Sequence, residues 1–157
     1  MIKKLILLSS LLGAFAVSSL QAADLNTQLV AAVVSGKVEL ARELMVLGAD
    51  VNAKNVVERP IIVLAAASGN VRTVRVLLAA GADVNAVDKL GNSALTEASA
   101  FGHSGVVKLL IASGADVNKA NTAGEAPLKK ANRAGHAEIE TMLKTAGAEE
   151  LKEEKKE

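Results

Sequence analysis

The chain has 157 residues, which is long enough for one domain with a continuous hydrophobic core. Its 18 basic and 17 acidic residues nearly cancel, so the charge balance lacks the basic excess of nucleic-acid-binding proteins. The absence of cysteine excludes disulfides and thiolate metal sites. Phe15 and Phe101 are the only aromatic residues, so alanine, valine and leucine must form most of the core.

Residues 1–22 have the pattern of a secretory signal peptide. Two lysines form a basic start, residues 5–17 are mostly apolar, and a small and polar exit follows. A membrane-spanning helix needs about 20 apolar residues, and this stretch is shorter. We expect cleavage after Ala22, with cleavage after Ala23 or an uncleaved anchor as alternatives. No cysteine follows that could carry a lipid, and we expect a periplasmic protein, full secretion being the alternative.

The string GADVN recurs through the rest of the chain. It begins at Gly48, Gly81 and Gly114, always at an interval of 33 residues, and a decayed copy begins at Gly147. A fixed period of this length is typical of an array in which each repeat is one supersecondary unit that packs only against its neighbours. The sequence therefore predicts a solenoid.

Each unit is predicted to hold two helices. The inner helices are rich in alanine, and the outer ones carry larger apolar residues at i, i+3 and i+4 spacing. Small residues inside and large ones outside predict a curved stack with a concave inner face. The inner helices are expected at residues 27–35, 60–68, 93–101 and 126–134, and the outer helices at residues 38–47, 71–80, 105–113 and 137–145.

The residues at the helix starts fit these bounds. Thr27 and Ser93 stand where a helix needs an N-cap, and Pro60 and Pro127 suit a first helical turn. In the second unit, Glu58 replaces a glycine that the later units carry before the inner helix. We therefore expect the turn in that unit to be irregular.

At the C-terminal end, polar residues replace apolar ones. Glu140 and Lys144 occupy positions that Val107 and Ile111 hold one unit earlier. A polar outer face on the last unit is what a soluble solenoid requires, so we expect a terminal cap there.

The residues between the GADVN strings carry a resemblance to a known family. Gly91, Ala98, Gly102-His103 and Leu109-Leu110 precede the third copy in the order turn, short helix, Gly-His turn and longer helix. This pattern resembles the ankyrin repeat, which implies helix-turn-helix units joined by β-hairpin-like fingers. We thus expect an all-α repeat solenoid of about four ankyrin repeats. Its parts are a signal peptide at 1–22, a repeat domain at 23–148 with units at about 23–54, 55–87, 88–120 and 121–148, and a charged tail at 149–157.

A search for chemistry finds no catalytic constellation. His103 and His136 each follow an inner-helix glycine, one repeat apart, and are interpreted as turn histidines that bond to the backbone. Asp50, Asp83 and Asp116 are spread one per layer, so they cannot pair as general acid and base. We therefore expect that the protein is not an enzyme and that it binds no metal, cofactor or nucleic acid.

The resemblance implies that a protein partner docks on the finger tips and the inner-helix face. Several of these positions are apolar where exposure is expected, and Phe101 is the candidate anchor, because aromatic residues dominate interface energetics. The alternative is that Val57 and Leu90 fold back and pack finger on finger. The candidate partner-binding residues are Lys54, Val56, Val57, Arg59, Ser68, Val87, Lys89, Leu90, Asn92, Phe101, Thr122, Glu125 and Arg133.

These features predict a non-enzymatic, monomeric protein-interaction module of the bacterial envelope. Some bacterial ankyrin proteins of this layout resemble accessory factors for periplasmic catalase and peroxide defence, which implies a protective role in stress. Others resemble immunity proteins that inhibit a toxic effector. A self-associating structural protein is a further alternative.

Overall fold

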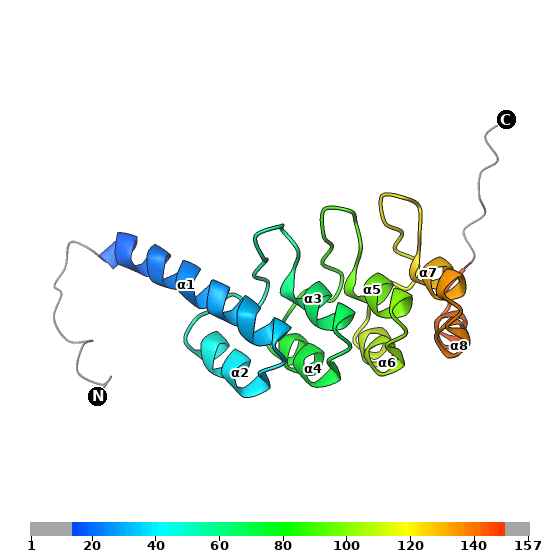
Figure 1. The fold of residues 1–157 in the computed structure, drawn as a ribbon, viewed down its shortest axis with the longest axis horizontal. Coiled ribbons are helices and arrows are strands. Elements are labelled where there is room, and N and C mark those ends of the chain that lie inside the picture. Colours follow the sequence, from blue (N-terminus) through cyan, green and yellow to red (C-terminus); the bar gives the residue numbers. More distant parts are fainter. Residues whose placement is uncertain (1–13, 150–157) are drawn as a thin grey trace.

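A computed structural model of the chain describes residues 14–149, with side chains described from residue 24 onward. The helices of this range form four pairs that lie side by side in one row, with one helix of each pair in an inner layer and one in an outer layer (Figure 1). The predicted all-α solenoid is confirmed. Inner helices are α1 (Ala14–Val34), α3 (Ile61–Ala67), α5 (Ala94–Ala100) and α7 (Pro127–Ala134); outer helices are α2 (Val38–Val46), α4 (Val71–Ala79), α6 (Ser104–Ala112) and α8 (Ala137–Thr145).

The start predicted for the first inner helix is wrong. Helix α1 begins at Ala14, and Thr27 lies within it rather than at its N-cap. The reason is local, because the segment before Thr27 contains alanine and leucine but no glycine or proline to stop a helix. The predicted signal peptide lies partly in residues 1–13, which are outside the described residues. Within residues 14–149, no helix has both the length and the apolar character needed to cross a membrane.

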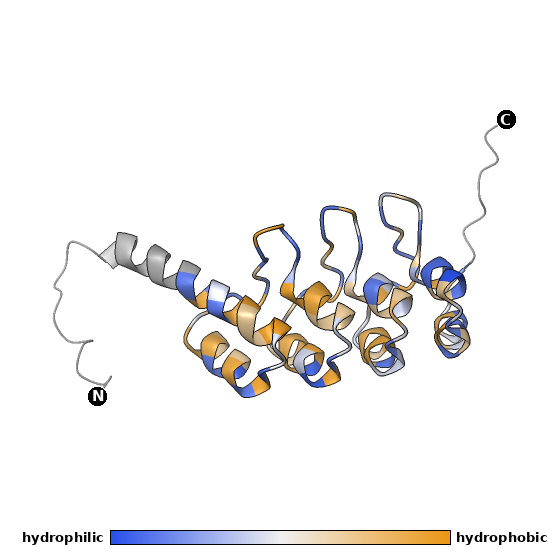
Figure 2. Cartoon of the chain, viewed as in Figure 1, coloured by the Kyte–Doolittle hydropathy of each residue, from blue (hydrophilic) through white to orange (hydrophobic). Residues whose placement is uncertain are grey.

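The core lies between the two layers of helices. Alanines of the inner helices, such as Ala65 and Ala98, are fully buried, as are Leu77 and Leu110 of the outer helices. Small inner side chains let neighbouring inner helices approach closely, and the larger outer ones fill the space below them. The colouring by hydropathy follows this arrangement, and α7 at the end of the row is mostly hydrophilic (Figure 2).

The helix starts after residue 60 agree closely with the sequence pattern. Ser93 is the N-cap of α5, and its hydroxyl accepts a hydrogen bond from the backbone N–H of Thr96 at 3.1 Å. Pro127 lies in the first turn of α7, as predicted. Pro60 instead occupies the N-cap position of α3, with ψ of 144°, so it precedes the first turn.

The turn that contains Glu58 is regular, contrary to the prediction. The N–H of Glu58 donates to the carbonyl of Asn55, as the N–H of Gly91 donates to Asp88 in the next finger. Asn55 Oδ1 also accepts from the N–H groups of Val57 and Arg59. Glu58 reaches this geometry at a φ of 64°, a left-handed conformation that costs a residue with a Cβ about 1 kcal/mol or more.

A ladder of asparagine side chains joins consecutive units. Asn52 ends the first GADVN string, and its Oδ1 accepts the N–H of Asp83 in the second string at 2.9 Å. The carboxylate of Asp83 in turn accepts the N–H of Asn85 at 2.9 Å, which confirms the turn-forming role predicted for the aspartates. Asn26 of α1 supplies the first rung, although it belongs to no GADVN string. The four rungs are Asn26 to Asp50, Asn52 to Asp83, Asn85 to Asp116 and Asn118 to Glu149.

Histidines form a second series of contacts between units. His103 Nε2 donates to the carbonyl of Ala67 at 3.0 Å, and His136 donates to that of Ala100 at 3.2 Å. The backbone-bonding role predicted for both is confirmed. A Cβ on Gly69 would come within 2.6 Å of the His103 ring, so the close approach of the histidine requires glycine there.

The C-terminal end of the row carries a polar surface, as predicted. Val107 is fully buried by the last unit, whereas Glu140, at the equivalent position in α8, is only half-buried, and Lys144 is exposed. At the opposite end Leu40 of α2 is 39% exposed, although its equivalent Val106 is fully buried. The two ends of the stack therefore differ in polarity.

Replacement of Glu58 by glycine should raise the free energy of unfolding by about 0.5 kcal/mol, because glycine removes the left-handed strain at some cost in backbone entropy. The ion pair of Glu58 with Lys54, at 3.8 Å, is exposed and contributes little. Urea denaturation measures the change. The matched variant is Gly124→Ala, where a Cβ meets nothing within 4 Å and φ is 70°, so it should lose about 1 kcal/mol from strain alone. A destabilised Glu58→Gly protein would contradict this account.

Replacement of Asn26 by alanine should lower the free energy of unfolding by about 1 kcal/mol, because the N–H of Asp50 loses its acceptor. Alanine favours a helix, so a loss cannot come from helix propensity. Gln28→Ala is the control, since the Gln28 side chain is exposed and bonds only to Asp24 of its own helix. Equal urea midpoints for the two variants would contradict a stabilising role of the first rung.

Candidate protein-binding face

Three fingers connect the helical pairs and project from the inner layer (Figure 1). Their turns are formed by residues 55–59, 88–92 and 121–125, which we call the first, second and third finger. Isolated antiparallel bridges at the base close the first two, between Lys54 and Pro60 and between Val87 and Ser93. Because each finger follows directly on a GADVN loop, the asparagine ladder also sets where the fingers stand.

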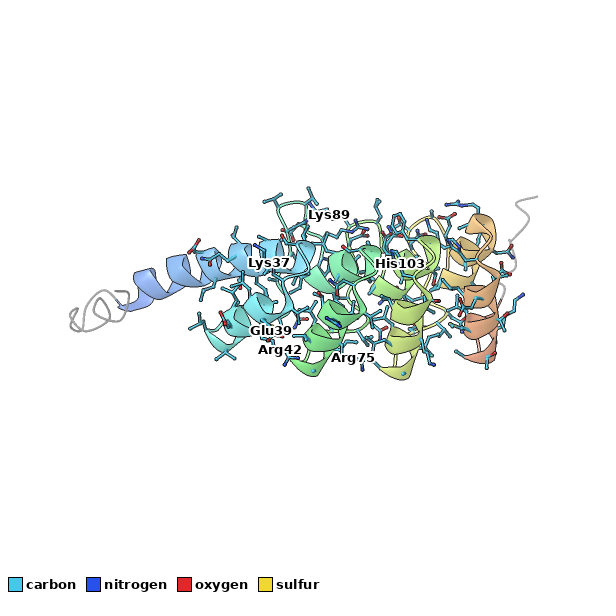
Figure 3. The ribbon with its side chains drawn as sticks, turned by 60° about the horizontal axis from the view of Figure 1, so that its bottom comes forward. Lys37, Glu39, Arg42, Arg75, Lys89 and His103 are labelled. Carbon is cyan, nitrogen blue, oxygen red and sulfur yellow. The ribbon has the colours of Figure 1, made fainter. Side chains whose placement is uncertain are left out.

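The structure places most of the predicted partner-binding residues at the surface of this side. Figure 3 shows Lys89 at the second finger, on the opposite side of the row from Arg42 and Arg75 of the outer helices. Arg59, Val87 and Glu125 are half-buried, and only Asn92 is buried. The exposed members are Lys54, Val56, Val57, Ser68, Lys89, Leu90, Phe101, Thr122 and Arg133.

The apolar residues of the first two fingers point into solvent. Val56 is 100% exposed, Val57 61% and Leu90 62%. The alternative that Val57 and Leu90 pack finger on finger is therefore wrong. Exposed apolar side chains on two neighbouring fingers make this surface a candidate for interaction with a partner.

Phe101 lies at the C-cap of α5 and is 59% exposed. One side of its ring stacks on His103, with the ring centroids 6.2 Å apart and the planes inclined by 29°. Since His103 is held by the carbonyl of Ala67, the histidine positions the phenylalanine while leaving most of it open. Phe101 is thus an aromatic side chain that His103 contacts on one side and that is otherwise open to a partner, as an anchor residue requires.

The prediction that Asn92 is open to a partner is corrected, because its side chain is used inside the protein. Only 7% of Asn92 is exposed, and its Oδ1 accepts from Asn121 Nδ2 at 2.8 Å. Its backbone N–H donates to Asp88 Oδ1 at 2.9 Å. The Asn92 amide links the second finger to the third through Asn121, which explains why Asn92 is buried.

Arg59 is engaged in an ion cluster rather than free at a rim. Its guanidinium contacts the Glu97 carboxylate of α5, and its Nε lies 3.5 Å from Asp88 Oδ2. Sequence reasoning did not single out Glu97, although a carboxylate on an alanine-rich inner helix, where the preceding unit has Leu64, was a usable signal. With both carboxylates about 90% covered, Arg59 is a positioning group for the first finger.

Glu125 holds a second ion cluster, in the third finger. Its carboxylate lies 2.6 Å from Lys130 Nζ and also contacts Arg133. The hydrogen bond from Lys130, helped by the charges of Lys130 and Arg133 and opposed by burial, lowers the pKa of Glu125 below its ordinary value of 4.5. Arg133 remains 66% exposed at its side chain, so it can still meet a partner.

An open groove of about 400 Å³ separates the first finger from the second. Val57 and Leu90 line it from the two fingers, and Arg59, Asp88 and Glu97 form its charged floor. The described residues contain no group of three histidine, aspartate or glutamate side chains that could hold a metal ion. His103 bonds to a backbone carbonyl rather than to the adjacent Ser104.

Comparison with known proteins decides the family. A family model described as Ankyrin repeats (3 copies) matches residues 29–121 and again residues 62–153. The chain belongs to the ankyrin repeat family. None of the curated protein sequences compared with it matches significantly. Membership indicates a protein–protein interaction module, and such modules are typically not enzymes.

Glu125 should make the stability of this ankyrin protein depend on pH. Because its pKa is lower in the folded state, its ionised form stabilises the fold above pH 4.5, and this stabilisation is lost as the pH falls through the folded-state pKa. Glu125→Gln should therefore be less stable at neutral pH and lose less stability on acidification, as urea denaturation between pH 3 and 7 would measure. Glu138→Gln, at an exposed carboxylate of α8, is the control. Identical acid slopes for wild type and Glu125→Gln would contradict the assignment.

Proposed function

We propose that this ankyrin protein is a non-enzymatic interaction module of the bacterial periplasm that binds a partner protein through its finger tips and inner-helix face. The observation that carries the proposal is the set of exposed apolar residues on that side, with Val56 and Val57 on the first finger, Leu90 on the second and Phe101 behind them. Exposed charges surround this set, among them Lys54, Lys89 and Arg133. An apolar centre with a polar rim is the usual anatomy of a protein interface.

The signal-peptide pattern of residues 1–22 supports the export step. Cleavage after Ala22 or Ala23 is compatible with the fold, since Leu25 packs against the core and Asn26 bonds to Asp50, and both residues lie beyond the cut. The resemblance noted above favours a protective accessory role in stress defence for the mature protein.

The outer-helix side of the array supplies a matched control for the binding test. Val46 and Leu47, at the end of α2, are 88% and 67% exposed, so they are as accessible as Leu90 and Phe101. They belong to the outer helices, away from the fingers. Truncation of either pair removes similar apolar surface from the protein and should cost little stability.

We expect a partner to co-purify with the protein from the envelope fraction of the source cell. The chain is expressed with its own leader and a C-terminal tag, as wild type, as Leu90→Ala, Phe101→Ala and as Val46→Ala, Leu47→Ala. A species retained by the wild type and by the outer-helix variant, and lost with the finger variant, would support the proposal. Mass spectrometry of the same sample should show a chain that begins at Ala23 or Asp24.

The same experiment can fail in two informative ways. If the same species co-purify with all three proteins, the binding face is wrongly placed. If only the protein itself is retained, and light scattering gives a dimer that Leu90→Ala, Phe101→Ala disrupts, the face serves self-association instead. An intact N-terminus at Met1 would contradict the leader assignment.

A further inference from the structure

The two junctions between neighbouring fingers are built differently. Between the second and third fingers, the backbone N–H and the hydroxyl of Thr122 both donate to the carbonyl of Leu90, at 2.9 and 3.0 Å. The equivalent groups one unit earlier are the N–H of Lys89 and the carbonyl of Val57. Neither forms a hydrogen bond within the described part of the chain. The first junction therefore lacks the main-chain link that closes the second.

The side chains at the two junctions explain the difference. At the second junction the amides of Asn92 and Asn121 bond directly, and a Cβ on Gly91 would come within 3.1 Å of the Asn121 backbone. At the first junction Arg59 stands in place of Asn92 and reaches past the second finger to Glu97 of α5. The groove of about 400 Å³ lies at this first junction.

The walls of this groove offer main-chain recognition. The N–H of Lys89 and the C=O of Val57, on neighbouring fingers, are a donor and an acceptor without a partner in the described part of the chain, and both residues line the groove. Addition of an extended segment to free main-chain groups is a recurring mode of peptide binding, in which neighbouring pockets supply the side-chain specificity. Val57 and Leu90, each more than half exposed, border the same opening.

The charged residues that line the groove balance, with Arg59 and Lys89 against Asp88 and Glu97. The single guanidinium of Arg59 faces two carboxylates, Asp88 and Glu97, whose side chains are only 10% and 11% exposed. Lys89 sits at the finger and makes no ion pair with either carboxylate in the described structure (Figure 3). The lining therefore carries no net charge, and recognition falls to the main-chain groups and to the two apolar side chains.

We propose that the groove between the first two fingers takes an extended segment of the partner polypeptide. Its backbone pairs with the N–H of Lys89 and the C=O of Val57. An apolar side chain of the segment lies between Val57 and Leu90. This inference rests on the proposed function, since it specifies how a partner engages the same face.

The probe is a library of random linear nonapeptides, displayed on phage and selected against the full-length chain. Enriched peptides are synthesised with a fluorescent label, and their Kd values are measured by fluorescence polarisation for wild type, Val57→Glu, Leu90→Glu and Val46→Glu. We expect the enriched sequences to share an apolar residue at one position. Both groove variants should weaken binding about tenfold or more, and the outer-helix variant Val46→Glu should leave the Kd unchanged.

Amide hydrogen exchange followed by NMR supplies a second measurement that does not depend on a variant. In the free protein the amide of Lys89 should exchange rapidly and that of Thr122 slowly, because only Thr122 is bonded across its junction. Addition of a selected peptide should slow the exchange of Lys89. A Lys89 amide already protected in the free protein, or one that the peptide leaves unchanged, would overturn the inference.

Failure of this inference can be told apart from failure of the proposed function. If the selection yields no peptide whose binding depends on Leu90, while Leu90→Ala, Phe101→Ala still loses the co-purified species, the face is correct and the partner docks as a folded surface. Enriched peptides without a shared apolar residue would overturn the role assigned to Val57 and Leu90. A dimer in light scattering that Leu90→Glu converts to monomer would assign the groove to a second copy of the chain instead.

Discussion

The fold depends on one repeated contact, the hydrogen bond from a backbone N–H of one loop to the asparagine side chain of the loop before it. Because Asn52 and Asn85 stand at the same place in successive units, each bond sets the next unit in the same register. The residue that donates this bond needs only its backbone N–H, which explains why Glu149 serves as well as Asp50. Inner helices rich in alanine can then approach closely, and the layers of the core follow from that approach.

The fingers inherit their positions from this ladder but not their contacts with each other. A left-handed residue closes the turn of every finger, whether it is Gly91, Gly124 or the strained Glu58. The contact with the next unit, in contrast, differs between fingers. The first finger uses Arg59, which reaches the Glu97 carboxylate, and the second finger uses the paired amides of Asn92 and Asn121. A regular scaffold with variable finger junctions is how a repeat protein acquires a site of its own, since the function lies in the surface that the fold carries.

Much of the fold could be predicted because its signals are local and repeated. Glycines, caps and apolar spacing place the helices after residue 60 to within about one residue, which is the ordinary scatter of helix ends. The start predicted for the first helix was wrong because its upstream extension lacks a stop signal, and the leader pattern suggested a separate segment. Glu58 was misjudged because a left-handed glutamate is locally unfavourable, yet the turn around it is held by Asn55 and tolerates the strain.

For the binding face, the sequence by itself determined which residues lie on the fingers and inner helices, since the 33-residue register assigns each position. It also determined that Val56, Leu90 and Phe101 are apolar at positions where the repeat does not bury them. Only the tertiary structure decided that Asn92 is buried, that Arg59 is held by Glu97, and that a groove opens between the first two fingers. Each of these features involves residues of different units. The side-chain contacts between units depend on how closely two fingers lie, and no local sequence pattern encodes that distance.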